Sequence, residues 1–299
     1  MKSAATILKS SERYRRIRKV LILVLIANFG VALAKGLVGL RADSISMVAD
    51  AFHSLMDGSS NIIGLVGVAL AARPRDETHS YGHAKFETFA SIGIVVLLLV
   101  TAIQIVESVY GRLTAETLAL PDAGPLAFAT MGFTMLVNTG VSYFERRQGQ
   151  KLSSTFLVAD SRHTMSDVYV SFSVIASLLA ARFGLAIVDI VVGGFIAGAI
   201  AVAAIRIMKE ASIVLLDRAV LDPAEVERVC LSVDEKGILG CHKVRTRGSE
   251  AGYWIDLHLL VEPELPTRKS HRIASVVERR LKDEYGEETD VVVHIEPGR

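Results

Sequence analysis

Six long apolar segments occupy most of the first two thirds of the 299-residue chain. They cover roughly residues 18–40, 44–72, 86–110, 123–143, 153–181 and 185–206. A helix needs about 20 largely apolar residues to cross the hydrocarbon core of a bilayer. The mean hydropathy of +0.41 is also high for a soluble domain. The sequence therefore predicts a membrane protein with an all-α bundle of six transmembrane helices.

Basic residues are concentrated at three places along the predicted bundle. Seven lie before or at the very start of the first apolar segment. The connection after the second segment contains Arg73, Arg75 and Lys85, and the connection after the fourth contains Arg146, Arg147 and Lys151. The other three connections hold about one basic residue each. Because cytoplasmic loops carry the excess of Lys and Arg, we expect a multi-pass protein of the cell membrane with both termini in the cytoplasm.

The chain after Lys209 has a different pattern. Residues 222–236 and 266–286 have helical patterns, the first with Asp222 as its cap and Pro223 in its first turn. Residues 240–247, 252–262 and 290–297 alternate as strands do. The sequence predicts a transmembrane domain over residues 1–209 and a small cytoplasmic α+β domain over residues 210–299, which contains both cysteines and no disulfide framework.

One ten-residue pattern occurs in two of the apolar segments. "VADAFHSLMD", residues 48–57, and "VADSRHTMSD", residues 158–167, both read V-A-D-x-x-H-x-x-x-D. Residues three and four apart share one face of a helix, so each segment is expected to carry an Asp–His–Asp stripe. An ionisable group at membrane depth costs about 2.5–3.5 kcal/mol even on lenient scales. Such groups therefore indicate a cavity, a partner or an ion.

A histidine and an aspartate from each pattern would give two nitrogen and two oxygen ligands, which suits tetrahedral Zn²⁺. The predicted helices run in opposite directions, as in inverted-repeat transporters, whose sites lie near the midplane. The simpler alternative is that these polar residues only join helices. A zinc hydrolase would need a His-Glu-x-x-His helix, which the chain lacks, so we do not expect an enzyme.

The first acid of each pattern, Asp50 or Asp160, is not needed for this ligand set. The two could bracket the site on its outer and inner sides and guide ions or protons. Alternatively, each braces its own helix, or Asp160 neutralises the nearby Arg162.

Other histidines indicate metal sites outside the membrane. Asp76, His79 and His83 form D-x-x-H-x-x-x-H in the connection after the second segment, where the alternative is a solvated loop. The predicted α+β domain holds His242, His258, His271 and His294. His294 and Glu296 are two apart on a predicted strand and therefore point to the same face. Any one of these four histidines could simply be a surface residue.

Taken together, these motifs resemble those of the cation diffusion facilitators, a family of divalent-metal/proton antiporters. The resemblance rests on "ADAFHSLMD", "HSYGHAKFE", "ADSRHTMSD", "LLDRA" and "HIEP". It implies a six-helix bundle followed by a metallochaperone-like cytoplasmic domain, and a homodimer. It also implies a transport site at His53, Asp57, His163 and Asp167, a second site at Asp76, His79 and His83, and a tail site drawing on His242, His258, His271, His294 and Glu296. The family pattern has Asp where this chain has Glu296.

The function expected from the sequence is export of Zn²⁺ from the cytoplasm in exchange for protons, with Zn²⁺ also acting as regulator in the tail. Efflux of Fe²⁺, Cd²⁺, Co²⁺ or Mn²⁺ by the same mechanism is the alternative, because N/O ligands do not exclude these ions. A membrane-anchored metal sensor is a third reading. The expected partners are divalent cations, protons, the lipid bilayer and a second copy of the chain. A net charge of +1 gives no field that would attract nucleic acid.

Overall fold

The computed structural model describes residues 10–41, 45–114, 125–182, 187–249 and 251–298. The chain divides into two compact units. One consists of Tyr14–Ala211, and the other of Ser212–Arg299 together with Met1–Arg13.

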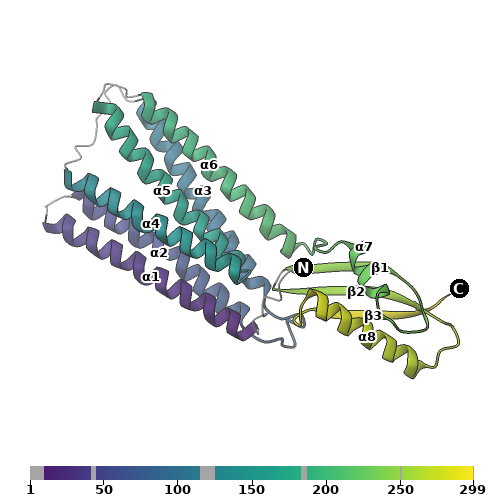
Figure 1. The fold of residues 1–299 in the computed structure, drawn as a ribbon. Helices are drawn as coiled ribbons and strands as arrows, with labels where there is room; N and C mark the ends of the chain where they lie inside the picture. Colours follow the sequence, from purple (N-terminus) through teal and green to yellow (C-terminus); the bar gives the residue numbers. More distant parts are fainter. Residues whose placement is uncertain (1–9, 42–44, 115–124, 183–186, 250, 299) are drawn as a thin grey trace. The chain divides into compact units, whose positions relative to one another are not determined.

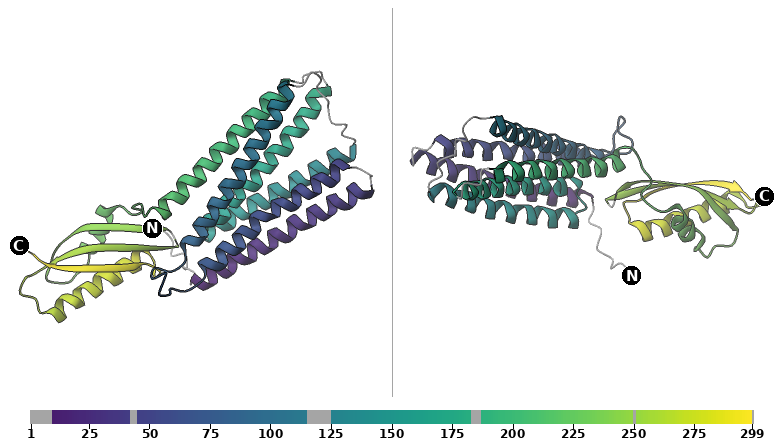
Figure 2. Two further views of the ribbon diagram at one scale, coloured as in Figure 1. Left: turned by 180° about the vertical axis from the view of Figure 1, so that it is seen from behind. Right: turned by 90° about the horizontal axis from the view of Figure 1, so that it is seen from above.

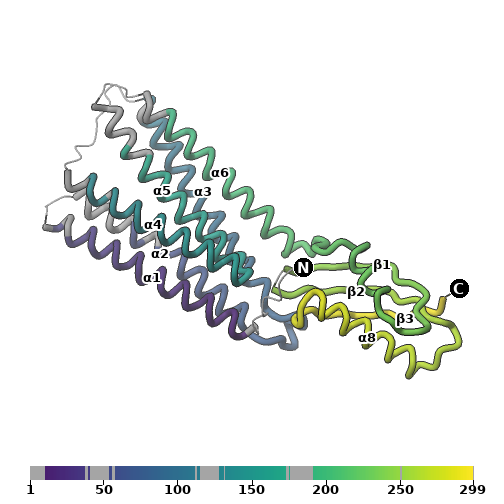
Figure 3. The backbone as a smooth tube through the Cα atoms, viewed as in Figure 1, coloured from purple at the N-terminus to yellow at the C-terminus, as the bar shows by residue number. Residues whose placement is uncertain are grey.

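The first unit is built from long helices that run side by side (Figures 1 and 2). The six helices are α1 (Ser10–Arg41), α2 (Ile45–Ala71), α3 (Lys85–Thr114), α4 (Pro125–Lys151), α5 (Thr155–Arg182) and α6 (Ile187–Leu215). Their path can be followed in Figure 3. Helix α5 packs against α4, α3 and α2. The two helices that carry the repeated pattern, α2 and α5, are therefore in contact.

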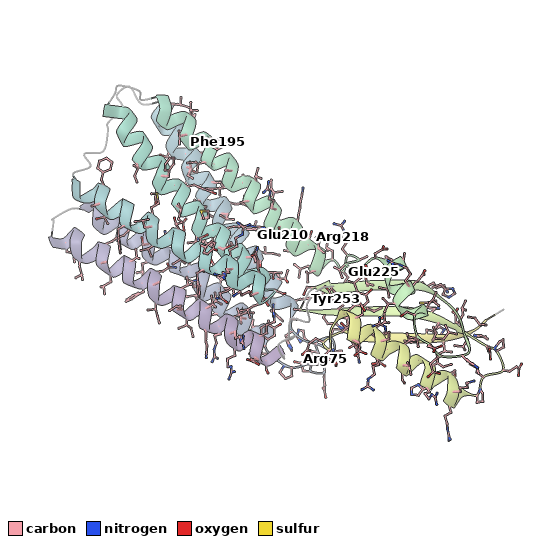
Figure 4. The ribbon with its side chains drawn as sticks, viewed as in Figure 1. Arg75, Phe195, Glu210, Arg218, Glu225 and Tyr253 are labelled. Atoms are coloured by element: carbon pink, nitrogen blue, oxygen red, sulfur yellow. The ribbon has the colours of Figure 1, made fainter. Side chains whose placement is uncertain are left out.

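Three of these helices are long and apolar enough to cross a membrane, judged over the described residues. The spans are Ser11–Leu37, Lys85–Gly111 and Val191–Leu215, in α1, α3 and α6. Over the described residues, α2 also has a shorter apolar stretch, Gly58–Ala71. Large apolar side chains also face outward from the unit, among them Phe195 of α6, which is 78% exposed (Figure 4). A membrane domain is therefore clear, while six spans remain a prediction.

Glycines in α2 allow the neighbouring helices to approach closely. A Cβ atom at Gly64 would overlap the ring of Phe156, a fully buried residue of α5. A Cβ atom at Gly67 would overlap Ala90 of α3. Small residues at such contacts are typical of helix packing in membranes, where close van der Waals contact drives association.

The second unit contains a three-stranded sheet and two helices. Its elements are α7 (Pro223–Leu231), β1 (Ile238–Ser249), β2 (Gly252–Val261), α8 (Thr267–Tyr285) and β3 (Asp290–Pro297). The strand order is β1-β2-β3, with β1 antiparallel and β3 parallel to β2. Asp222 caps α7, as the sequence predicts, because its side chain accepts a hydrogen bond from the backbone N–H of Ala224.

Both helices cover the same face of this sheet, as the right-hand view of Figure 2 shows. The core combines Val226 and Cys230 of α7, Ile273, Val277 and Leu281 of α8, and Ile255, Leu257, Leu259 and Val261 of β2. Successive side chains of a strand point to opposite faces. The even-numbered residues of β2, His258 among them, therefore lie on the face away from α7 and α8.

Candidate metal sites

A small polar cavity lies within the helical bundle. Its volume is about 20 Å³, which is enough for roughly one water molecule. Four helices line it: Asn28 and Val31 come from α1, Ser54 and Ser60 from α2, Asn138 from α4, and His163, Thr164 and Asp167 from α5. Two of the predicted transport ligands, His163 and Asp167, therefore face a common space.

The buried imidazole of His163 has a ring nitrogen that is available to a ligand. Its side chain is 5% exposed, and its Nδ1 atom is buried without a hydrogen-bond partner among the described groups. A buried polar atom that has no partner costs free energy, so an unpartnered imidazole nitrogen beside a cavity fits a role as a ligand. His53 and Asp57 lie in α2, but their side chains, like that of Asp50, fall outside those that the structure describes.

Polar residues surround the cavity and connect its helices. Nζ of Lys35, a buried residue of α1, donates to Oγ of Ser54 at 2.8 Å. Nδ2 of Asn28 donates to Oδ1 of Asn61 at 3.0 Å, and Nδ2 of Asn61 donates to Oδ2 of Asp160 at 3.0 Å. The bundle therefore holds a continuous hydrogen-bonded chain across α1, α2 and α5.

The suggestion that Asp160 neutralises Arg162 is wrong. Arg162 forms two hydrogen bonds with Glu210 of α6, at 2.8 and 2.9 Å. The reason is helix geometry, because residues two positions apart do not face each other. Asp160 is fully buried, whereas the guanidinium of Arg162 reaches Glu210 on α6.

A second cluster lies in the connection between α2 and α3. One ligand atom from each of Asp76, His79 and His83 lies within 4.8 Å of the others. Asp76 Oδ1 accepts hydrogen bonds from the backbone N–H groups of Thr78 and His79, at 3.0 and 2.6 Å. This is the local turn that Asp side chains favour, and it brings a carboxylate next to two imidazole rings.

The orientation of His83 leaves one of its nitrogens available. Its Nδ1 atom lies 3.0 Å from the carbonyl oxygen of Pro74. Since a carbonyl only accepts, Nδ1 carries the hydrogen, and Nε2 faces Asp76 Oδ2 at 3.4 Å. Such a bond to the non-ligating nitrogen orients the histidines of metal sites. Hydrogen bonds from the hydroxyl of Thr78 and the backbone of His79 lower the pKa of Asp76 to about 2, so this carboxylate is ionised at neutral pH.

The third cluster lies on the outer face of the tail sheet. The strand register places His242 of β1 opposite His258 of β2, and His258 opposite His294 of β3. The three imidazoles therefore form a row across the sheet, with ring centroids 5.5 and 4.6 Å apart. Glu296 follows two residues after His294 and shares its face.

Glu296 bridges the histidines of this row. His258 Nδ1 lies 2.7 Å from its Oε1 atom, and His242 Nε2 lies 2.9 Å from its Oε2 atom. His294 is farther away, at 3.7 Å. Hydrogen bonds from His258 and then His242 lower the pKa of Glu296. Ligand atoms of His242, His258 and Glu296 all lie within 4.8 Å of one another, so one ion could replace the hydrogens between them.

His271 does not join this cluster. It is exposed on α8, which packs on the opposite face of the sheet. Sequence spacing offers no signal for this separation, because the face that a helix covers depends on how the whole domain packs.

Several polar residues around the cavity were not predicted from the sequence. Glu145 is fully buried on α4, and its Oε2 atom accepts a hydrogen bond from Thr164 at 3.1 Å. Lys35, Asn28 and Asn138 also lie at or beside the cavity. The signal that could have revealed Lys35 is its charge within a long apolar segment. Glu145 lies just after the fourth apolar segment, next to Arg146 and Arg147, so the sequence carried no such signal for it.

Comparison with known proteins relates these features to a family. A family model described as a cation efflux transmembrane domain matches residues 21–216. A model of the cytoplasmic domain of cation efflux proteins matches residues 221–298.

Three relatives show how far the similarity extends. Transporter MJ0449 of Methanocaldococcus jannaschii is 30% identical over 275 residues, covering 90% of this chain and 94% of that protein. The manganese efflux system protein MneS of Bacillus subtilis is 28% identical over 290 residues, covering 96% of this chain and 98% of MneS. Metal tolerance protein C1 of Arabidopsis thaliana is 27% identical over 296 residues, covering 93% of this chain, and the chain spans 62% of the length of that relative. The chain therefore belongs to the cation diffusion facilitator family of divalent metal cation efflux transporters.

Proposed function

We propose that the protein exports Zn²⁺ from the cytoplasm in exchange for protons. The observation that carries the proposal is the cavity lined by His163 and Asp167 of α5. It is also lined by Ser54, which directly follows His53 and precedes Asp57 by three residues in α2. His53 and Asp57 would complete a set of two nitrogen and two oxygen ligands. This set suits the tetrahedral coordination that Zn²⁺ prefers.

Exchange for protons follows from the chemistry of these ligands. Imidazole and carboxylate must be deprotonated to bind a metal ion, so the ion and protons compete for the same atoms. When the site faces the cytoplasm, Zn²⁺ displaces protons. When it faces outward, protons displace Zn²⁺.

The two other clusters support a regulatory role for cytoplasmic metal. With both termini in the cytoplasm, as the basic loops predict, the cluster at Asp76 and the cluster at Glu296 both lie on the side from which Zn²⁺ leaves. We infer that the protein acts as a homodimer, and that metal binding in the tail favours transport when cytoplasmic Zn²⁺ rises.

A different ion is the second candidate. One relative is named a manganese efflux system protein, and mixed N/O ligands accept several divalent ions. The same site could then export Mn²⁺, Fe²⁺, Co²⁺ or Cd²⁺. A membrane-anchored metal sensor is the remaining alternative, and it would need the tail cluster but not the cavity.

Metal uptake into vesicles tests the proposal. Purified protein is reconstituted with an imposed pH gradient, and uptake of Zn²⁺, Mn²⁺, Fe²⁺, Co²⁺ and Cd²⁺ is compared. Zn²⁺ should move fastest, and only with the gradient. Asp57→Ala and Asp167→Ala should abolish uptake, because each removes one ligand of four. Glu107→Ala is the matched control, since Glu107 is an exposed carboxylate of α3. A well-folded Asp167→Ala protein that moved zinc at the wild-type rate would exclude this site.

A further inference from the structure

Two fully buried carboxyl groups lie next to the transport cavity. Glu145 of α4 and Asp160 of α5 are both 0% exposed. Oε2 of Glu145 accepts a hydrogen bond from Thr164 at 3.1 Å, and Oδ2 of Asp160 accepts one from Asn61 at 3.0 Å. Each carboxyl therefore has one oxygen with an ordinary donor.

Among the residues that the structure describes, no donor reaches the remaining oxygen of either group. Oε1 of Glu145 and Oδ1 of Asp160 are buried and lack a hydrogen-bond partner among the described groups. Thr164 links the two residues, because its hydroxyl lies 3.1 Å from Oε2 of Glu145 and 3.2 Å from the backbone carbonyl oxygen of Asp160, and the two neighbouring carboxyl groups interact with each other. Two ionised carboxylates only accept hydrogen bonds, so this contact would be repulsive as it stands. A single proton between them turns it into a hydrogen bond and removes one of the two buried charges.

The charged groups around the pair do not neutralise both acids. On α5 itself, His163 favours a negative charge on Asp160, whereas the carboxylate of Asp167 disfavours a negative charge on Glu145. Arg162 is paired with Glu210 on α6. Two other buried charged residues of the bundle are Lys35 on α1, which donates to Ser54, and Glu87 on α3. Neither residue is hydrogen-bonded to Glu145 or Asp160 in the contacts described above, and a shared proton would remove one of the two negative charges of the pair.

Hydrogen bonds join the pair to the cavity in two ways. Thr164 lines the cavity and donates to Glu145. Asn28 also lines the cavity, and it reaches Asp160 through Asn61. Asp160 precedes His163 by three residues, which is about 4.5 Å along the helix axis. Neither acid belongs to the proposed ligand set, yet a divalent cation in the cavity would act on both at short range.

We propose that Glu145 and Asp160 share one proton, and that this carboxyl pair is a proton site of the exchange. The proton leaves when a divalent cation enters the cavity, because a nearby positive charge favours the ionised pair. By linkage, the protonated pair weakens cation binding to the same degree. The inference rests on the proposed exchange and adds to it a place for one proton that the metal ligands do not hold.

Two measurements on purified full-length protein test the pair. Infrared difference spectroscopy should show a protonated carboxyl signal that disappears on adding Zn²⁺, and Glu145→Gln should lack this signal. Calorimetry in buffers of different ionisation enthalpy counts the protons released per bound Zn²⁺. Glu145→Gln should release about one proton fewer than the wild type. The amide of Gln can still accept the hydrogen bond from Thr164, so the fold is expected to be kept, and Asp160→Asn provides a second variant.

Glu87→Gln is the matched control, because Glu87 is a buried acid of α3 that lies outside the pair. It should keep both the infrared signal and the wild-type proton count. An unchanged proton count in Glu145→Gln and Asp160→Asn, or an infrared signal that survives both substitutions, would overturn the assignment. Failure of the exchange itself looks different, since the wild type would then release no protons and show no uptake driven by a pH gradient.

Discussion

His258 Nδ1 donates a hydrogen bond to Glu296 Oε1 across 2.7 Å, although the two residues stand 38 positions apart in the chain. The contact joins the central strand β2 to β3, and His242 reaches the other oxygen of the same carboxylate from β1. One carboxylate thus holds two imidazoles in place before any metal arrives.

Glu296→Ala should lower the amount of Zn²⁺ bound per chain at equilibrium. The substitution removes a ligand and the acceptor that orients two others, and loss of such orienting contacts typically costs 10–100-fold in metal affinity. Titration of the purified full-length protein measures the change. His271→Ala is the control, because this exposed histidine lies outside the cluster, and it should bind as the wild type does. Equal losses in the two variants would contradict the site as drawn.

The stability of the tail should depend on pH through Glu296. Hydrogen bonds from His258 and then His242 lower the pKa of Glu296 in the fold. The resulting stabilisation is complete above the ordinary carboxyl pKa of about 4.3 and is lost as the pH falls through the lowered value. Trp254 is the single tryptophan and lies in β2, so its fluorescence reports unfolding of this domain. The stability difference between wild type and Glu296→Gln should shrink as the pH falls below about 4.3; a constant difference would argue against the linkage.

Asp76→Asn should weaken metal binding in the connection between α2 and α3. Hydrogen bonds from the hydroxyl of Thr78 and the backbone of His79 lower the pKa of Asp76 to about 2, so its carboxylate is ionised and available at neutral pH. Binding should still decline as the pH falls, because protons compete with a metal ion for its ligand atoms. Glu77→Gln provides the control, since its exposed carboxylate is not part of the cluster. A similar loss in this control would indicate a general effect of charge.

Gly64→Ala should destabilise the bundle by about 1–3 kcal/mol, the usual cost of overpacking. The added methyl would overlap the buried ring of Phe156, and α2 and α5 would have to separate. Thermal unfolding in detergent measures the change. Gly30→Ala is a suitable comparison, because a Cβ atom at this α1 glycine meets nothing within 4 Å. If both variants melted alike, the close approach of α2 and α5 would not matter for stability.

The ion pair between Arg162 and Glu210 should contribute little to the stability of the bundle. The side chains are 31% and 54% exposed, and exposed pairs are worth about 0.2–1 kcal/mol. A double-mutant cycle with Arg162→Gln and Glu210→Gln should give a coupling energy in that range. Arg162→Gln should also keep transport, although Arg162 lies within the repeated pattern. Loss of transport would assign this residue a role that its contacts do not indicate.

The sequence by itself determined the secondary-structure elements and the position of the repeated motif. Apolar length predicts long helices, and the repeated spacing of Asp, His and Asp identifies one face of α2 and one of α5. Asp222 and Pro223 predict the start of α7, and alternation predicts the three strands. These features depend on residues a few positions apart, so a local pattern is sufficient to reveal them.

Tertiary packing decided which of these residues meet. Strand register aligns His242, His258 and His294 on one face, and helix packing places α8, with His271, on the other. Asp160 lies against Glu145 rather than Arg162 because α4 packs beside α5 and because neighbours two apart on a helix point in different directions. Each of these outcomes depends on contacts between residues that are distant in the chain. The spacing of residues within one segment therefore cannot predict which faces pack against each other.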